Sequence, residues 1–246
     1  MKKPDELGFR KCLEKNGIKL RWNFESKGSY LESCRHYLDY YEKLYGEYMP
    51  KNKKANILEI GCGWGWFLYY MDNKGYKNIL GVDPDAHRLS VINKFGIHKT
   101  RKIDAFAFLK NKKNFYDLIV SVYILEHVPK KKVFEFLRLA YRALKKGGRI
   151  IVAVPNMESP LNLRSRYMDF THETGFTVNS LLHVLYYSNF DGLKVKEEFM
   201  MPKAAEKKKK YKGAVKSLKG IYDDLCVRAP FFFAETLIAS GVKNKS

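Results

Sequence analysis

The chain contains a short apolar segment that runs directly into three closely spaced glycines. Residues 57–65 read Ile-Leu-Glu-Ile-Gly-Cys-Gly-Trp-Gly, which predicts a buried strand followed by a glycine turn. Because glycine has no Cβ, the backbone amides of such a turn can approach a bound ligand closely. Eighteen residues after Gly65, a second apolar segment ends at Asp83, whose carboxylate can accept both hydroxyls of a ribose. The two features together predict a pocket for a nucleoside-containing cofactor.

The spacing of the glycines indicates which cofactor the pocket binds. A dinucleotide site needs Gly-x-Gly-x-x-Gly/Ala, because the last small residue lets the helix pack tightly beside the pyrophosphate. Here the glycines are Gly61, Gly63 and Gly65, and the third fingerprint position is Trp66, which argues against NAD. With Glu59 they form Glu-x-Gly-x-Gly-x-Gly. This motif resembles that of the class I S-adenosylmethionine (SAM)-dependent methyltransferases.

The resemblance implies a fold, a cofactor and a set of contacts. The expected fold is α/β, a Rossmann-like class I methyltransferase fold with a mostly parallel seven-stranded sheet and helices on both faces. The expected cofactor is SAM, with S-adenosylhomocysteine as the product. Asp104 would lie beside the adenine, although it would also serve as the N-cap of a helix over 105–110. The residues expected to contact the cofactor are Glu59, Gly61, Cys62, Gly63, Gly65, Trp66, Asp83, Pro84, Asp104, Ala105, Ser121 and Tyr123.

Strand and helix patterns alternate along the middle of the chain, which predicts a parallel sheet with right-handed crossovers. Residues 1–50 are expected to form a helical segment, residues 51–200 the SAM-binding core, and residues 201–246 a basic helix and closing strand of the same domain. The predicted strands lie near 56–60, 78–82, 98–102, 116–122, 148–154, 193–200 and 230–240. The predicted helices lie near 29–49, 64–74, 84–95, 104–110, 130–145, 177–188 and 213–228. Lys145-Lys146-Gly147-Gly148 is expected to end the helix over 130–145, and Thr177 to cap the helix that follows it.

A polar loop over 156–175 leaves the C-terminal end of the fifth predicted strand, where open parallel sheets bind ligands. Residues 167–177 read Tyr-Met-Asp-Phe-Thr-His-Glu-Thr-Gly-Phe-Thr. The run Tyr-x-Asp-Phe-Thr-His-Glu-x-x-Phe-Thr resembles methyltransferases encoded with bacterial capsule and O-antigen polysaccharide genes. The resemblance implies a small anionic acceptor, such as a sugar nucleotide or another glycan precursor.

His172 is the predicted general base, since imidazole titrates near neutrality and can take a hydroxyl proton. Asp169 is predicted to orient it or to bind the substrate, and Tyr123 completes the predicted catalytic set. Alternatively, the side chains of the Asp-Phe-Thr-His run only hold the loop together. A phosphate or phosphoramidate acceptor would need no base. The residues predicted to bind the acceptor are Tyr123, His127, Arg164, Arg166, Tyr167 and His172, of which the arginines could pair with phosphate.

No metal site is expected from the sequence. Some relatives hold a divalent metal with two glutamates three residues apart, but Tyr123 occupies the first of these positions and only Glu126 remains. The cysteines show no Cys-x-x-Cys pairing, so free thiols in a reducing cytoplasm are expected for Cys12, Cys34, Cys62 and Cys226.

The formal net charge of +20 could indicate nucleic-acid binding, but 35 lysines and 11 arginines are spread over the whole length. Attraction of a small anionic substrate explains the charge equally well. A peripheral membrane contact through the basic helix over 213–228 is an alternative. No apolar run approaches the ~20 residues of a membrane span, and the N-terminus lacks a secretion signal, so a cytoplasmic enzyme is expected. The rival functions are a methyltransferase of RNA or another small molecule, and an NAD-dependent sugar-nucleotide enzyme. The sequence makes no prediction about oligomeric state.

Overall fold

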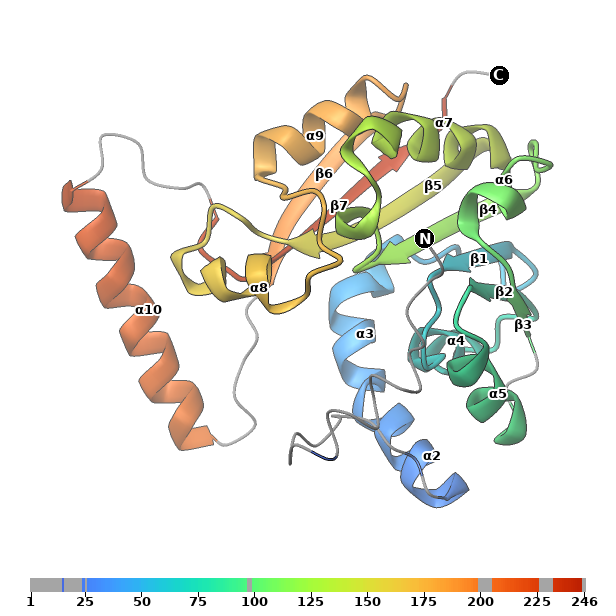
Figure 1. The fold of residues 1–246 in the computed structure, drawn as a ribbon, viewed down its shortest axis with the longest axis horizontal. Coiled ribbons are helices and arrows are strands. Elements are labelled where there is room, and N and C mark those ends of the chain that lie inside the picture. Colours follow the sequence, from blue (N-terminus) through green and yellow to red (C-terminus); the bar gives the residue numbers. More distant parts are fainter. Residues whose placement is uncertain are drawn as a thin grey trace.

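The computed structural model describes residues 15, 24, 26–96, 99–198, 205–225 and 232–244. A seven-stranded sheet with the order β3-β2-β1-β4-β5-β7-β6 lies at its centre (Figure 1). Strands β1 to β5 pair in parallel, and β7 runs antiparallel between β5 and β6. This mixed sheet confirms the fold predicted from the sequence. The strands are β1 (Asn56–Ile60), β2 (Asn78–Asp83), β3 (Thr100–Lys102), β4 (Tyr116–Val122), β5 (Leu144–Pro155), β6 (Asp191–Glu198) and β7 (Thr236–Val242).

Helices cover both faces of the sheet (Figure 1). One face carries α2 (Lys27–His36), α3 (Leu38–Tyr45), α4 (Trp66–Asn73) and α5 (Ala86–Lys94), and the other carries α6 (Ala105–Leu109), α7 (Val133–Ala143) and α9 (Val178–Tyr186). Successive side chains of a strand point to opposite faces, so β4 contributes to two cores. Leu118 and Val120 pack with the first helix layer, and Ile119 packs with the second.

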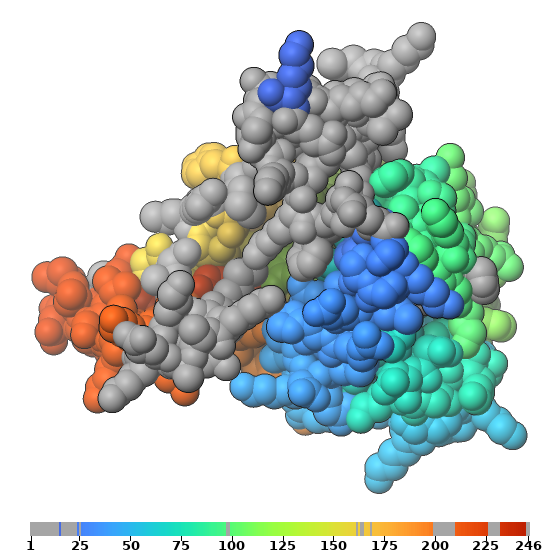
Figure 2. Space-filling view, turned by 90° about the horizontal axis from the view of Figure 1, so that it is seen from below, coloured from blue at the N-terminus to red at the C-terminus, as the bar shows by residue number. Residues whose placement is uncertain are grey.

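The predicted helix over 29–49 is two helices in the structure. Helix α2 ends at His36 and α3 begins at Leu38, with a short 3-10 turn, η1 (Gly46–Tyr48), after α3. Between the helices, the ring of Tyr37 stacks on Trp66 at 4.7 Å between centroids. The amphipathic pattern carries no information about this ring contact, so it did not predict the break. Figure 2 shows α2 and α3 (blue) on the surface beside α4 and α5 (teal to green).

The predicted helix end at Lys145–Gly148 is wrong. Leu144 already pairs with Tyr116 of β4, so α7 ends at Ala143 and β5 begins one residue later. Gly147 has φ 76°, and its N–H donates to the carbonyl of Lys243. The basic and glycine residues therefore belong to an irregular start of β5, next to the bulge in its pairing with β4.

The last strand begins later than predicted, at Thr236 rather than near residue 230. The backbone that precedes Thr236 forms hydrogen bonds with side chains instead of with a neighbouring strand. Glu197 accepts the N–H groups of Phe233 and Ala234, while Asn156 donates to the carbonyls of Phe232 and Ala234. Because these polar groups are already satisfied, the ladder starts only at Thr236.

Helix α10 (Ala205–Leu225) is longer than the helix predicted over 213–228 and extends away from the two helix layers (Figure 1). Tyr222 contacts the ring of Phe233 at 5.3 Å, whereas Ile221 and Leu225 are exposed. Among the helices of the described ranges, none is long and apolar enough to cross a membrane.

Candidate active site

The glycine turn after β1 has the backbone geometry that the motif predicts. Gly61, Gly63 and Gly65 have φ values of 74°, 50° and 71°, in the left-handed region that favours glycine. A Cβ placed on Gly61 would lie 2.0 Å from Cδ1 of Ile124, which follows β4. The turn therefore depends on glycine both for its conformation and for the close approach of the β4 end.

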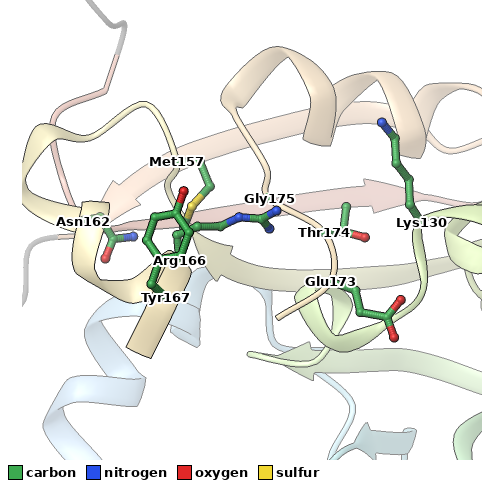
Figure 3. A pocket seen from close by; sticks show the side chains of 8 residues that line it. All are labelled: Lys130, Met157, Asn162, Arg166, Tyr167, Glu173, Thr174 and Gly175. Atoms are coloured by element: carbon green, nitrogen blue, oxygen red, sulfur yellow. The ribbon is translucent and has the colours of Figure 1, made fainter. Parts of the chain in front are cut away.

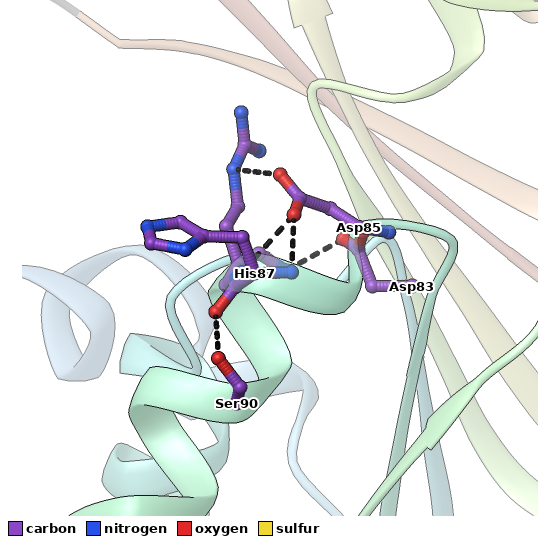
Figure 4. Close-up of polar contacts among 6 residues, drawn as sticks. Asp83, Asp85, His87 and Ser90 are labelled. Atoms are coloured by element: carbon purple, nitrogen blue, oxygen red, sulfur yellow. Dashed lines mark hydrogen bonds and ion pairs between the residues drawn. The ribbon is translucent and has the colours of Figure 1, made fainter. Parts of the chain in front are cut away.

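Asp83 links the tip of β2 to this turn. Its Oδ2 accepts the N–H of Gly63 at 2.8 Å, and its Oδ1 accepts the N–H of Asp85 at 2.8 Å (Figure 4). A carboxylate has about four acceptor positions, so each oxygen retains capacity for one ribose hydroxyl. Pro84 connects Asp83 to Asp85, which caps α5 and forms an ion pair with Arg88 at 2.9 Å.

Glu59 and Cys62, two of the residues predicted to contact the cofactor, are buried. Burial raises the pKa of the Glu59 carboxyl well above its usual value, and the negative charge of Asp83 raises it further. Burial likewise raises the pKa of the Cys62 thiol. Within the described ranges, Cys34 and Cys62 are free and buried cysteines, whereas Cys12 and Cys226 lie outside these ranges.

Two aromatic residues of the predicted cofactor set make structural contacts. The indole of Trp66 donates to Ser33 of α2 at 3.0 Å, so this side chain joins α4 to α2. Tyr123 adopts φ 56°, which is rare for a residue with a Cβ, and its hydroxyl bonds to Thr236 of β7 at 2.8 Å. Such strained residues at strand ends are concentrated in functional sites.

Asp104 caps α6, which is the helix-capping role that the sequence predicts for it. Its Oδ1 accepts the N–H groups of Phe106 and Ala107, and Ala105 is the first residue of the helix. Ser121 lies within β4 with no exposed surface, and no partner for its hydroxyl is present in the described part of the chain.

The Asp-Phe-Thr-His segment packs onto the turn after β4. This turn is the 3-10 helix η2 (Leu125–His127), and the carbonyl of Glu126 accepts the N–H groups of Glu173 and Thr174 at 2.9 and 3.0 Å. Thr174 also donates through its hydroxyl to the carbonyl of Val128. Residues more than 40 positions apart in the chain are thereby brought together.

This contact creates a cluster of Glu126, His127 and His172, called here the His–His–Glu cluster. One ligand atom from each lies within 4.8 Å of the others. The two imidazole rings are 4.7 Å apart between centroids. Burial raises the pKa of Glu126 to about 8, and burial and the nearby His172 lower the pKa of His127.

The hydrogen bonds at Nδ1 determine which nitrogen of each imidazole carries the lone pair. Nδ1 of His172 lies 2.8 Å from the carbonyl of Ser165, which can only accept, so Nδ1 carries a proton. Thr171 gives its hydroxyl proton to Asp169 at 2.6 Å, so it accepts from Nδ1 of His127 at 2.8 Å. The neutral forms of both rings therefore have a lone pair on Nε2.

The orienting partner predicted for His172 is different in the structure. Asp169 bonds through its carboxylate to Thr171 and acts through it on His127, whereas the carbonyl of Ser165 orients His172. Glu126, Thr171 and Ser165 are not among the site residues predicted from the sequence. The Glu-His pair at the end of a strand is the one sequence signal that could have indicated the cluster.

A cavity of about 390 Å³ lies beside the cluster. Arg166 extends into it toward Gly175, with Lys130 and Glu173 on the opposite side (Figure 3). Nη1 of Arg166 is buried without a hydrogen-bond partner among the residues that the structure describes. Arg166 and Tyr167 belong to α8 (Leu163–Met168), which follows the 3-10 turn η4 (Pro160–Asn162) in the predicted loop. The side chain of Arg164 lies outside the described part of the structure.

The sheet order, the glycine turn after β1 and the acid at the tip of β2 together define a Rossmann-like class I methyltransferase. The chain belongs to the methyltransferase-domain family, whose model matches residues 32–194. It is therefore an enzyme that transfers methyl groups, and SAM is its cofactor.

The chain is similar to several known proteins. An uncharacterised protein of Methanocaldococcus jannaschii is 29% identical over 142 residues, which cover 56% of this chain and 60% of that protein. A tRNA U34 carboxymethyltransferase of Helicobacter acinonychis is 26% identical over 129 residues, which cover 45% of this chain and 44% of that enzyme. The chain thus spans less than two thirds of the length of both curated relatives. The crystal structure of a SAM-dependent methyltransferase from Archaeoglobus fulgidus has the same fold, with a TM-score of 0.64, 23% identity, and coverage of 86% of this chain and 97% of that chain.

Proposed function

We propose that the enzyme methylates an oxygen atom of a small anionic acceptor, and that this acceptor is a precursor of a cell-surface polysaccharide. The methylated group would be a sugar hydroxyl, or the phosphate or phosphoramidate group of a nucleotide-linked intermediate. The resemblance of residues 167–177 to methyltransferases of capsule and O-antigen gene clusters supports this acceptor class.

The cavity beside the His–His–Glu cluster, lined by Arg166 and Lys130 together with Glu173, is the observation that carries the proposal. A buried guanidinium N–H without a partner is costly, and a bound phosphate would supply the missing acceptor. Arg166 can bind phosphate with two parallel hydrogen bonds, and Lys130 would add a second positive charge. An acceptor anchored there by its phosphate would extend toward His172, because Glu173 and Thr174 line the cavity.

In the proposed reaction, the acceptor oxygen attacks the methyl carbon of SAM. The new C–O bond forms as the C–S bond breaks, and S-adenosylhomocysteine leaves. Alignment of the oxygen, carbon and sulfur atoms is expected to supply much of the rate. A neutral hydroxyl must also lose its proton, and we propose that Nε2 of His172 accepts this proton.

A screen with isotopically labelled SAM tests the acceptor class. Sugar nucleotides, phosphorylated monosaccharides and transfer RNA are offered separately, and the label transferred to each is counted. Transfer to a sugar nucleotide or sugar phosphate is expected, and it should be reduced in the Asp83→Asn variant at a SAM concentration that does not saturate it. Transfer to RNA alone would overturn the proposed acceptor class.

A further inference from the structure

We propose that the His–His–Glu cluster binds a divalent transition-metal ion such as Zn²⁺. The three ligand atoms belong to Glu126 and His127 of η2, which follows β4, and to His172 of the segment packed on it. Binding of the ion requires only these three side chains. The role of the ion in catalysis rests on the proposed function.

The carboxylate of Glu126 is the first reason to expect a cation. Its side chain is 2% exposed, and neither oxygen has a hydrogen-bond partner within the described residues. Leaving a buried carboxyl group unpaired is costly, because the water it has lost is not replaced. A cation bound between the carboxylate and the two histidines would supply the missing partner.

The hydrogen bonds of the two histidines leave one nitrogen of each ring available to a metal ion. Both present Nε2 as the lone-pair nitrogen, since Nδ1 donates to the carbonyl of Ser165 in His172 and to Thr171 in His127. Asp169 in turn accepts the hydroxyl proton of Thr171. Metal-binding histidines commonly have such partners on the second nitrogen, which fix the tautomer and the ring orientation.

The donor set indicates the class of metal. Two imidazole nitrogens and one carboxylate oxygen suit Zn²⁺, Fe²⁺ or Co²⁺, whereas Ca²⁺ and Mg²⁺ prefer sites made of oxygen atoms. Three protein ligands leave a coordination position open, as in catalytic zinc sites. Donors around a tetrahedral ion lie roughly 3.4 Å apart, so the cluster would contract by about an ångström when the ion binds.

Such an ion would lie near the expected site of the methyl donor. Ile124, two residues before Glu126, lies directly over Gly61 of the glycine turn. An acceptor hydroxyl bound at the open position would ionise there and release its proton to solvent, and its oxygen would then attack the methyl carbon. With the ion bound, Nε2 of His172 would be a ligand and could not accept the proton, so the ion would take over the role proposed above for His172 as the base. The sequence predicts no metal site because Tyr123 stands where some relatives have their first metal-binding glutamate. In the proposed site, His172 supplies the ligand that is missing there.

Cobalt binding tests the proposal without any acceptor. The full-length chain, free of affinity tags and stripped with a chelator, is titrated with Co²⁺ while the visible absorption of nitrogen-coordinated cobalt is recorded. Saturation at one ion per chain is expected. His172→Ala and Glu126→Gln should each weaken binding by at least about tenfold, and His183→Ala on the exposed face of α9 should not.

Absence of cobalt binding in the unmutated chain, or equal affinity in all variants, would overturn the metal proposal. Calorimetric titration with SAM in the same variants shows that they remain folded and separates the two proposals. Retained SAM affinity with lost cobalt binding supports the metal site. Cobalt binding by a chain that methylates only RNA would leave the metal site in place and contradict the proposed acceptor.

Discussion

The carboxylate of Asp83 accepts a hydrogen bond from the backbone N–H of Gly63 at 2.8 Å. This bond joins the acid at the tip of β2 to the glycine turn after β1, so the two halves of the predicted cofactor site are fixed relative to one another. The conformation of the turn is thereby fixed before a ligand binds, which lowers the entropy cost of binding.

Replacing Asp83 should weaken SAM binding strongly. Asp83→Asn keeps the size of the side chain but loses the charge and one acceptor for the ribose hydroxyls. Hydrogen bonds to charged groups contribute roughly 1.5–3 kcal/mol, so a loss of about tenfold to a hundredfold in affinity is expected. Isothermal titration calorimetry measures it, with Asp72→Asn on the exposed end of α4 as the control. Unchanged affinity in Asp83→Asn would place the cofactor elsewhere.

A methyl group on Gly61 should destabilise the fold. Gly61→Ala combines a left-handed φ with a contact to Ile124, for an expected cost of about 2–4 kcal/mol. Gly75→Ala is the matched control, because Gly75 has φ 82° but nothing within 4 Å of the added atom. Urea denaturation should show a smaller loss for Gly75→Ala, and Ile124→Ala should recover part of the loss in Gly61→Ala. Equal losses at both glycines would show that the contact with Ile124 contributes nothing.

His172→Ala should reduce turnover far more than it weakens SAM binding. Removal of a group that acts on the acceptor proton typically costs about 10²–10⁴ in rate. Initial rates with the acceptor from the screen, together with SAM titration, separate the two effects. Turnover within about twofold of the unmutated enzyme would remove His172 from the mechanism and would fit an acceptor that is already anionic.

Arg166→Gln should raise KM for a phosphorylated acceptor and leave SAM affinity unchanged. Glutamine keeps a polar side chain but cannot pair with a phosphate dianion, so a loss of roughly tenfold or more in kcat/KM is expected. Arg138→Gln on α7, whose Nε donates to the carbonyl of Phe134, is the control. An equal response of both variants would show that the cavity does not bind the acceptor.

Stability should fall as the pH rises because of Glu198. Burial raises the pKa of its carboxyl to about 7, although the Tyr40 hydroxyl opposes this shift. An unfolded glutamate titrates near 4.3, so between about pH 4.3 and 7 the folded state holds a proton that the unfolded state has lost. The contribution of Glu198 to the free energy of unfolding is therefore fully present below about pH 4.3. It falls by roughly 1–3 kcal/mol as the pH rises to about 7. Glu198→Gln should remove this part of the slope in denaturation curves from pH 4 to 8. Parallel pH profiles for the two proteins would contradict the assignment.

The sequence predicts the strands and the glycine turn around the expected cofactor site well, because local patterns determine them. The strand, the glycine turn and the acid at the next strand end are each encoded in short segments. The parallel sheet then brings Asp83 and Gly63 to the same edge. The capping box at Thr177 and the cap at Asp104 are also local, and both occur where the sequence places them.

The rest depends on contacts between distant segments. The break at Tyr37 involves Trp66, and the start of β5 depends on the pairing of Leu144 with Tyr116. The His–His–Glu cluster depends on the bonds from the backbone N–H groups of Glu173 and Thr174, directly after His172, to the carbonyl of Glu126. Periodicity and motif spacing carry no information about such pairs.

The most direct test of the account is a crystal structure of the enzyme with SAM bound. The ribose hydroxyls should bond to Asp83, and the methionine part should lie against Gly61–Gly65. The methyl group should face the His–His–Glu cluster. SAM bound at another surface, or with its methyl group directed away from His172, would contradict the account.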